Sequence, residues 1–176
     1  LSGDPTRAAV DLFRWQPPAG RGRRERISLD PADTYAYFEL IDDAYNANPA
    51  SMAAALEVLA ASDPQEQIGR GPRRVAILGD MLELGQEEER SHAQLAVNNH
   101  LLTVDVVHCV GPRMRACYDA LPTALRGRWV PEAQELASGL GELIAPGDRV
   151  LVKGSLGSKV SMIVDLIRNL GHRSQP

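Results

Sequence analysis

The sequence predicts an α/β fold of the Rossmann-like type, a doubly wound and mostly parallel sheet with helices on both faces. From residue 42 onward, short apolar segments alternate with longer helical ones, which is the order found in βαβ units. Most of the apolar segments are continuous runs, as strands are when helices cover both sides of a sheet. The crossovers between such parallel strands are expected to be right-handed.

Six strands are expected from these runs. Three of them end next to a glycine, which favours a turn at that point: Arg74–Leu78, Val104–Val110 and Arg149–Lys153. The segment Arg128–Val130 is a brief fourth strand. Two further strands, Ile27–Leu29 and Tyr35–Ile41, flank a turn that contains proline and two aspartates, so we expect a hairpin.

Five helices are expected after residue 42. The pair Asn48-Pro49 marks the start of the first, because asparagine caps helices well and proline fits the first turn. The acidic start of the second suits the positive end of its dipole. The expected helices are Ser51–Ala61, Glu87–Leu102, Met114–Ala120, Glu132–Ile144 and Ser158–Leu170.

The first 41 residues are less regular. Leu1–Trp15 can form the end of a helix, and the prolines at 17 and 18 then interrupt regular structure. The basic run Arg21–Arg26 fits a solvated loop and a phosphate contact equally well. Because a helix end and a hairpin do not make a complete domain, we expect this region to close a domain that begins upstream.

Composition excludes several classes of protein. The chain has 176 residues, 44% of them hydrophobic, which can support a sizeable core, and a net charge of −4 argues against a general nucleic-acid binder. It contains no apolar run long enough for a membrane span, and no charged-then-apolar segment opens it, so we expect neither a span nor a secretory signal. Cys109 and Cys117 lie among apolar neighbours, which indicates buried thiols in a reducing cytoplasm. His92 and His100 are too far apart on their expected helix for a zinc site.

Four polar clusters follow the ends of expected strands. They are residues 42–48 (Asp-Asp-Ala-Tyr-Asn-Ala-Asn), Gly79-Asp80, Gly111-Pro112-Arg113 and Lys153-Gly154-Ser155. Ligands of open α/β sheets bind beyond the carboxyl ends of the strands. We therefore expect the four clusters to line one rim of the sheet, where one ligand can contact several of them.

Each cluster also has a structural explanation. Asn48 caps its helix in any case, whereas the amide of Asn46 suits a base edge or a group beside a phosphate. Asp80 fits ribose hydroxyls and a cap of the next turn equally well. Lys153, Gly154 and Ser155 lie at a helix entrance and suit a carboxylate or phosphate. The competing explanation is a lysine with a buried stem that pairs with Asp42 or Asp43.

Several familiar motifs of chemistry are absent from the sequence. It contains no G-x-x-x-x-G-K-[ST] loop, and no G-x-G-x-x-G element opens the first helix. No Ser–His–Asp or Cys–His set can be nominated. This sequence therefore predicts neither a triphosphate loop of its own nor a dinucleotide cofactor.

Four segments, in order along the chain, resemble signatures of the Mur ligases, and specifically of those that add D-alanyl-D-alanine to the UDP-linked peptidoglycan precursor. They are Gly20-Arg21, residues 41–52 (IDDAYNANPASM), residues 75–85 (VAILGDMLELG) and residues 150–158 (VLVKGSLGS). One such match is weak, but four in the same order and spacing are specific.

The resemblance implies a fold, a reaction and a division of the chain. Such ligases have a UDP-sugar domain, a central ATPase domain and a C-terminal Rossmann-like domain. Residues 1–44 would be the end of the central domain and residues 45–176 the C-terminal domain. With ATP and Mg²⁺, the full-length enzyme activates UDP-N-acetylmuramoyl-tripeptide as an acyl phosphate, which the amine of D-alanyl-D-alanine attacks. The chain alone is expected to be inactive, because phosphoryl transfer depends on parts that it lacks.

The resemblance also assigns roles to residues of the rim. Nucleotide binding falls to Arg21, Tyr45, Asn46, Asn48 and Asp80. Lys153, Gly154 and Ser155 would lie on the side of the dipeptide and the acyl phosphate. It assigns no catalytic residue and no metal ligand to this part of the enzyme.

Two other classes of protein share some of these features. A signalling receiver domain also has an acidic pair after its first strand and a lysine after its last, as Asp42, Asp43 and Lys153 would be. It needs an acceptor aspartate after its third strand, where this chain has Val110-Gly111-Pro112, so we reject it. A free-standing, non-catalytic module for binding nucleotide or a partner stays open, because it would keep the same rim.

Overall fold

A six-stranded sheet organises residues 17–64 and 71–170, which are the residues that the computed structural model describes. The strands are β1 (Arg23–Ser28), β2 (Tyr37–Asp43), β3 (Arg74–Gly79), β4 (Val106–Val110), β5 (Arg126–Val130) and β6 (Arg149–Lys153). Their order across the sheet is β1-β2-β6-β3-β4-β5, and every pair is parallel except β1 with β2. The expected mostly parallel α/β sheet is confirmed. The expected helix within Leu1–Trp15 lies outside the described residues.

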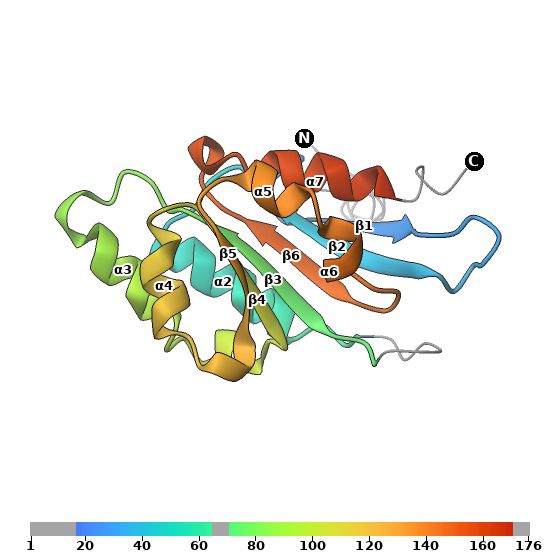
Figure 1. Ribbon diagram of the computed structural model, residues 1–176, viewed down its shortest axis with the longest axis horizontal. Helices are drawn as coiled ribbons and strands as arrows, with labels where there is room; N and C mark the ends of the chain where they lie inside the picture. The colour runs from blue at the N-terminus through green and yellow to red at the C-terminus, as the bar shows by residue number, and fades with distance from the viewer. Residues whose placement is uncertain (1–16, 65–70, 171–176) are drawn as a thin grey trace, which may run out of the picture.

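Helices cover both faces of the sheet (Figure 1). One face is covered by α2 (Pro49–Ala60), α3 (Glu88–Leu95) and α4 (Met114–Ala120), and the other by α5 (Ala133–Ala137), α6 (Leu140–Leu143) and α7 (Ser161–Arg168). Short 3-10 turns are η1 (Gly85–Glu87), η2 (Leu101–Thr103), η3 (Thr123–Leu125) and η4 (Leu156–Ser158). The chain is thus doubly wound, as the pattern of apolar runs predicts.

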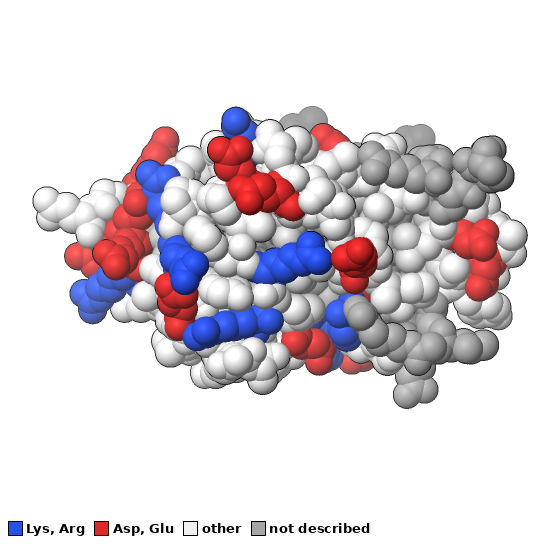
Figure 2. All heavy atoms as spheres, in the orientation of Figure 1, with Lys and Arg blue, Asp and Glu red and all other residues white. Residues whose placement is uncertain are grey.

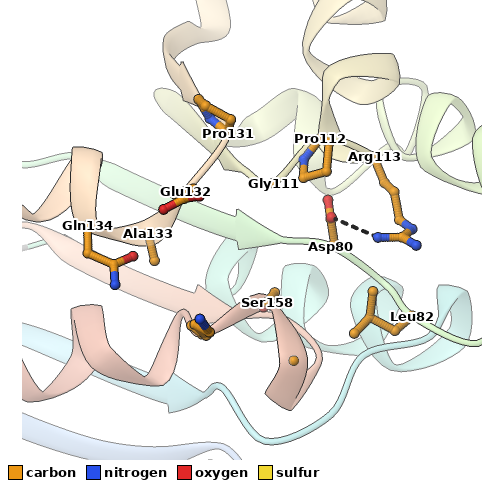
Figure 3. A pocket seen from close by; sticks show the side chains of 12 residues that line it. Asp80, Leu82, Gly111, Pro112, Arg113, Pro131, Glu132, Ala133, Gln134 and Ser158 are labelled. Atoms are coloured by element: carbon orange, nitrogen blue, oxygen red, sulfur yellow. Dashed lines mark ion pairs between the residues drawn. The ribbon is translucent and has the colours of Figure 1, made fainter.

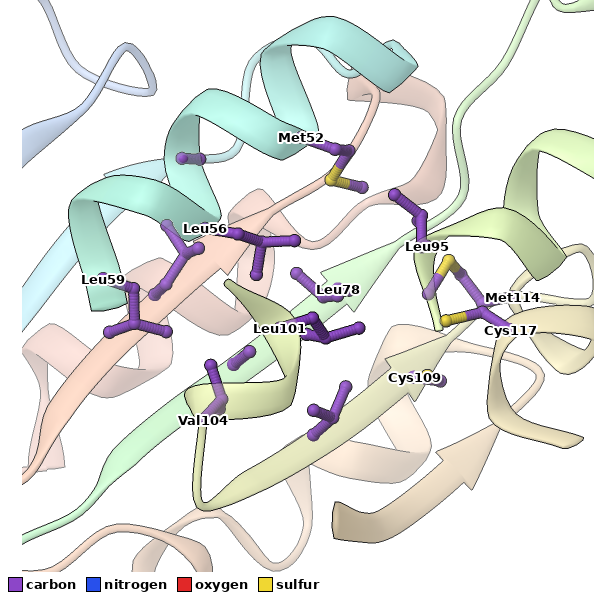
Figure 4. Packing of buried hydrophobic residues seen from close by; sticks show 14 of the residues in the cluster. Met52, Leu56, Leu59, Leu78, Leu95, Leu101, Val104, Cys109, Met114 and Cys117 are labelled. Carbon is purple, nitrogen blue, oxygen red and sulfur yellow. The ribbon is translucent and has the colours of Figure 1, made fainter. Parts of the chain in front are cut away.

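The hydrophobic core has two layers, one on each side of the sheet. Within β3, Ala76 and Leu78 face the layer under α2 to α4, whereas Val75 and Ile77 face the layer under α5 to α7. Side chains that alternate between two buried faces explain why the strand is a continuous apolar run. Figure 4 shows the first layer, in which α2 contributes Met52, Leu56 and Leu59.

The basic run is not a solvated loop, because Arg23–Arg26 belongs to β1. This strand pairs antiparallel with β2 at the edge of the sheet, in a register that places Arg24 opposite Ile41. In the strand only Ile27 is buried. An edge strand needs little apolar surface and tolerates charged side chains. The prediction from hydrophobicity therefore started this strand at Ile27, four residues after its actual start at Arg23.

Three expected helices are shorter in the structure. The second ends at Leu95, since the side chain of Asn98 accepts the N–H groups of His100 and Leu101 and so starts a new turn. The fourth divides into α5 and α6 at Ser138 and Gly139. The last begins at Ser161, because Lys159 before it has a left-handed backbone with φ of 58°.

The division expected between residues 44 and 45 does not coincide with a break in the sheet. β2 lies inside the sheet, between β1 and β6, and the N–H of Gly22 donates to the carbonyl of Asp42. Residues 23–43 therefore fold together with the strands and helices that follow them.

The described surface carries charges of both signs. On the face shown in Figure 2, acidic and basic side chains lie intermixed. Among the described helices, none combines the length and apolar character needed to cross a membrane.

Candidate functional site

The four polar clusters meet at one edge of the sheet. Strands β2, β6, β3 and β4 are neighbours in that order and run in the same direction. The clusters that follow these strands therefore occupy consecutive positions along the carboxyl edge. The expected common rim is confirmed.

A pocket of about 350 Å³ opens at this rim beyond the ends of β3, β4 and β5 (Figure 3). Its lining includes charges of both signs: the carboxylates of Asp80 and Glu132 and the cationic groups of Arg113 and Lys159. Leu82 adds an apolar contribution. Such a lining suits a small polar ligand that carries both a positive and a negative group.

Asp80 lies at the edge of this pocket with only 3% of its surface exposed. Its Oδ1 accepts the N–H of Met114 at 2.8 Å, so Asp80 caps the start of α4 instead of the turn that follows it in sequence. Burial raises the pKa of Asp80, while the hydrogen bonds from the backbone of Met114 and Arg113 oppose that increase. Gly111 leaves space for this carboxylate, because a Cβ there would collide with it.

Arg113 links the pocket to α3. Its Nη1 lies 3.6 Å from Oδ2 of Asp80, and its Nε lies 2.6 Å from Oε1 of Glu88. The side chain keeps 39% exposure. Its guanidinium is therefore held at the mouth of the pocket and stays accessible to an anionic group.

Lys153 is buried and paired. Its Nζ donates to Oδ2 of Asp43 at 2.7 Å and to the carbonyl of Asn46 at 2.9 Å, and 1% of the residue is exposed. Of the two explanations for Lys153, the structure shows the pairing with an aspartate, and Asp43 is the partner. Burial raises the pKa of Asp43, and the bond from Lys153 opposes this.

Ser155 and Gly154 also lie beneath the surface of the rim. The hydroxyl of Ser155 donates to the carbonyl of Ala47 at 3.3 Å and accepts the N–H of Leu82 at 3.0 Å. A Cβ on Gly154 would lie 2.6 Å from Oγ of Ser158, so glycine permits close packing there. Neither residue, nor Lys153, is among those that line the pocket beside Asp80.

A second group of candidates lies after β2. The guanidinium of Arg21 stacks over the ring of Tyr45 at 4.7 Å from its centroid, and the tyrosine is 48% exposed. Asn46 is exposed, and its Oδ1 accepts the N–H of Ala47. Asn48 caps α2 by accepting the N–H of Ser51 at 2.9 Å, as predicted.

The candidates for nucleotide binding therefore form two groups rather than one. Arg21, Tyr45, Asn46 and Asn48 lie around the end of β2, whereas Asp80 follows β3. Strand β6 separates the two ends. A ligand that contacts both groups must span the buried Lys153 pair between them.

Sequence reasoning missed several residues of the rim. Glu132 and Lys159 line the pocket, and Arg168 donates to Asp42 at 2.8 Å and also pairs with Glu25. The bond to Glu25 is the main cause that raises the pKa of Arg168, and it lowers the pKa of Glu25. Glu132 could have been predicted from the sequence because it follows β5. The pairs of Arg168 with Asp42 and Glu25 leave no local signal, because these residues are far apart in the sequence.

Within residues 17–64 and 71–170, no three His, Cys, Asp or Glu side chains lie close enough together to hold a metal ion. The carboxylates of Asp80 and Asp43 pair with Arg113 and Lys153.

Comparison with known proteins identifies the class. Residues 22–156 match the family described as Mur ligase, glutamate ligase domain. The chain therefore belongs to the Mur ligase family.

Its curated relatives carry one particular name. The chain is 34% identical over 126 residues to the UDP-N-acetylmuramoyl-tripeptide–D-alanyl-D-alanine ligase of Rickettsia prowazekii, a match that covers 72% of this chain and 26% of that protein. It is 35% identical over 134 residues to the enzyme of that name from Escherichia coli, over 75% of this chain and 27% of that protein. The chain thus spans about a quarter of the length of these relatives.

Solved structures agree on the fold. A MurF ligase from Acinetobacter baumannii superposes with a TM-score of 0.70 at 26% identity, over 89% of this chain and 32% of that one. A MurF ligase from Thermotoga maritima in complex with ADP gives 0.73 at 19% identity, over 94% of this chain and 34% of that one. At this lower identity the likeness concerns the fold alone.

Proposed function

We propose that this chain is the C-terminal part of an ATP-dependent ligase that joins D-alanyl-D-alanine to UDP-N-acetylmuramoyl-tripeptide in peptidoglycan precursor synthesis. The observation that carries the proposal is the rim, where three motifs of this ligase type meet beside a pocket lined by charges of both signs. We place the enzyme in the cytoplasm, where its nucleotide-linked substrate would be made.

The pocket beside Asp80 is the place that best suits the dipeptide. A dipeptide carries a carboxylate and an amine, and the pocket offers Arg113 and Lys159 for the first and Glu132 for the second. Arginine binds carboxylates well because its planar group donates two parallel hydrogen bonds. In this proposal Lys153, Gly154 and Ser155 support the pocket from beneath rather than contact the dipeptide.

The stacked pair of Arg21 and Tyr45 suits the adenine of ATP. An exposed aromatic ring offers a flat surface on which a base can stack, and a guanidinium plane adds to it. The exposed amides of Asn46 and Asn48 are the neighbouring groups that could read the base edge. Asp80 stays the candidate for ribose hydroxyls, because it follows β3, the strand of the dipeptide pocket that lies nearest to β2 in the sheet, and so would lie at the border between the two ligands.

The remaining parts of the reaction are assigned to the rest of the enzyme. ATP supplies the phosphoryl group that activates the tripeptide carboxylate, and the dipeptide amine then displaces phosphate to form the amide bond. The phosphate-binding loop, the Mg²⁺ ligands and the sugar domain would lie in the part of the relatives that this chain does not span. Because β1 belongs to the sheet, we place the start of the C-terminal domain near residue 22.

Kinetics of the full-length enzyme test this proposal. Asp80→Asn keeps an oxygen for the N–H of Met114 but removes the charge, and we expect the KM for ATP to rise about tenfold, as for one lost charge-assisted hydrogen bond. Glu87→Gln, an exposed carboxylate on the following loop, is the matched control and should leave KM unchanged.

Three results would count against parts of the proposal. An unchanged KM for ATP in Asp80→Asn removes Asp80 from the nucleotide site. A full-length protein that releases no ADP with both substrates and Mg²⁺ refutes the ligase assignment. ADP release by the 176-residue chain alone contradicts the expectation that this part is inactive.

A further inference from the structure

His92 is a buried histidine that the proposed function leaves unused. It lies in α3 with no exposed surface. Its Nε2 is 2.9 Å from the backbone nitrogen of Met81, and its Nδ1 is 2.7 Å from the carbonyl oxygen of Glu88. An amide can donate only to an unprotonated ring nitrogen, and a carbonyl can accept only from a protonated one. The geometry therefore assigns the neutral ring with its proton on Nδ1.

Ser155, in the loop after β6, makes two hydrogen bonds to the same segment. Its backbone N–H donates to the carbonyl of Asp80 at 3.0 Å, and its hydroxyl accepts the N–H of Leu82 at 3.0 Å. Met81 itself is fully buried. The carbonyl of Asp80 and the N–H of Leu82 are thus bonded to Ser155 in the loop after β6. The N–H of Met81, between them, is bonded to His92 in α3.

The segment 80–82 contains two of the residues that line the pocket. Asp80 and Leu82 both line it, and they flank the residue whose N–H is bound by His92. A buried amide that loses its acceptor is costly, so the segment would turn to find another partner. Such a turn would displace the Asp80 carboxylate from the N–H of Met114, which it caps.

We propose that His92 is a positioning residue that fixes the backbone of residues 80–82 and thereby the Asp80 side of the ligand pocket. This inference rests on the proposed function for its kinetic consequence, but not for its structural one. His92 itself does not line the pocket, so it acts through Met81 and Asp80 rather than by contact with a ligand.

Three substitutions at one position separate this role from simple packing. Glutamine places an oxygen near the position of Nε2, so His92→Gln can still accept the N–H of Met81. Asparagine places its oxygen nearer to Nδ1, and leucine has no acceptor, so His92→Asn and His92→Leu leave that N–H without a partner. If His92 served only in packing, the changes in KM would instead follow the size and polarity of the substituted side chain.

In the full-length enzyme we expect His92→Gln to keep KM for ATP and for the dipeptide within about twofold of wild type. His92→Asn and His92→Leu should raise KM about tenfold, the factor equivalent to about 1.4 kcal/mol, while kcat changes less. Equal KM values for the Gln and Leu variants overturn the proposal.

A spectroscopic measurement on the 176-residue chain decides the structural claim without ligation. Nitrogen-15 NMR should show His92 protonated on Nδ1 and unprotonated on Nε2. Hydrogen exchange at the amide of Met81 should be slow in wild type and in His92→Gln, and fast in the Asn and Leu variants. The opposite tautomer, or equal exchange in all variants, refutes the inference. A full-length protein without ligase activity would refute the proposed function and leave this result standing.

Discussion

Acidification should weaken the fold through His108, which lies in β4 with 3% of its surface exposed. Its Nδ1 accepts the N–H of Arg128 at 2.9 Å, which requires an unprotonated nitrogen. Burial, followed by the charges of Arg128 and Arg73, lowers the pKa of His108 from 6.5 to about 4. The folded protein therefore keeps this ring neutral where an unfolded chain would protonate it.

The sign and size of the effect follow from these two pKa values. As pH falls, the unfolded chain takes up the proton near pH 6.5 and the folded chain only near pH 4, so acid favours unfolding within this range. The contribution of His108 is complete above pH 6.5 and is lost progressively down to about pH 4. One pKa unit corresponds to about 1.4 kcal/mol, so about 2.5 kcal/mol should be lost by about pH 4.5.

Urea denaturation at neutral pH and near pH 4.5 measures this loss. Carboxylates also titrate in the acidic range, so the comparison is with His108→Asn, whose oxygen can still accept the N–H of Arg128 but does not titrate. Between the two pH values wild type should lose about 2.5 kcal/mol more than the variant, a relative shift of about 1 M in the urea midpoint. His100→Asn, at a partly exposed position, is the control. Equal pH dependence in wild type and His108→Asn refutes the reasoning.

Two further predictions concern residues of the rim. Lys153→Met should lower the free energy of unfolding by about 3 kcal/mol, because it leaves Asp43 without its partner. The double variant with Asp43→Asn should recover part of this loss. Lys159→Met, at an exposed position, is the control and should leave the stability nearly unchanged. If Lys153→Met is as stable as wild type, the pair does not stabilise the fold. Asn48→Ala should cost about 1 kcal/mol through loss of the α2 cap. Asn46→Ala, two residues earlier on the exposed loop, should cost clearly less. Equal costs would contradict the capping assignment, and urea denaturation measures both.

Much of the architecture could be predicted from local pattern. The apolar runs of β3, β4 and β6 identify buried parallel strands, and parallel strands place the clusters after them on one edge. The cap by Asn48 could also be predicted, because its partner Ser51 lies only three residues away. In each case the deciding interactions are either local or follow from the direction of the strands.

The roles of individual rim residues depended on contacts between distant parts of the chain. Lys153 could equally have faced a ligand, and only the pairing of β2 with β6 brings Asp43 within 2.7 Å of it. Asp80 caps α4 across 34 positions of sequence. Lone residues of this kind carry no periodic signal, since their partners are brought close only by tertiary folding.

The sequence by itself determined the class of fold, the family and the edge of the sheet at which the motifs gather, because hydrophobic periodicity and ordered motifs are local properties. Only the tertiary structure decided that Arg23–Arg26 is an edge strand, that Lys153 is buried in a pair with Asp43, and that His92 accepts the N–H of Met81 beside Asp80. The physical reason is that burial and hydrogen-bond partners depend on which strands and helices become neighbours, and that choice minimises the free energy of the whole domain rather than of any one segment.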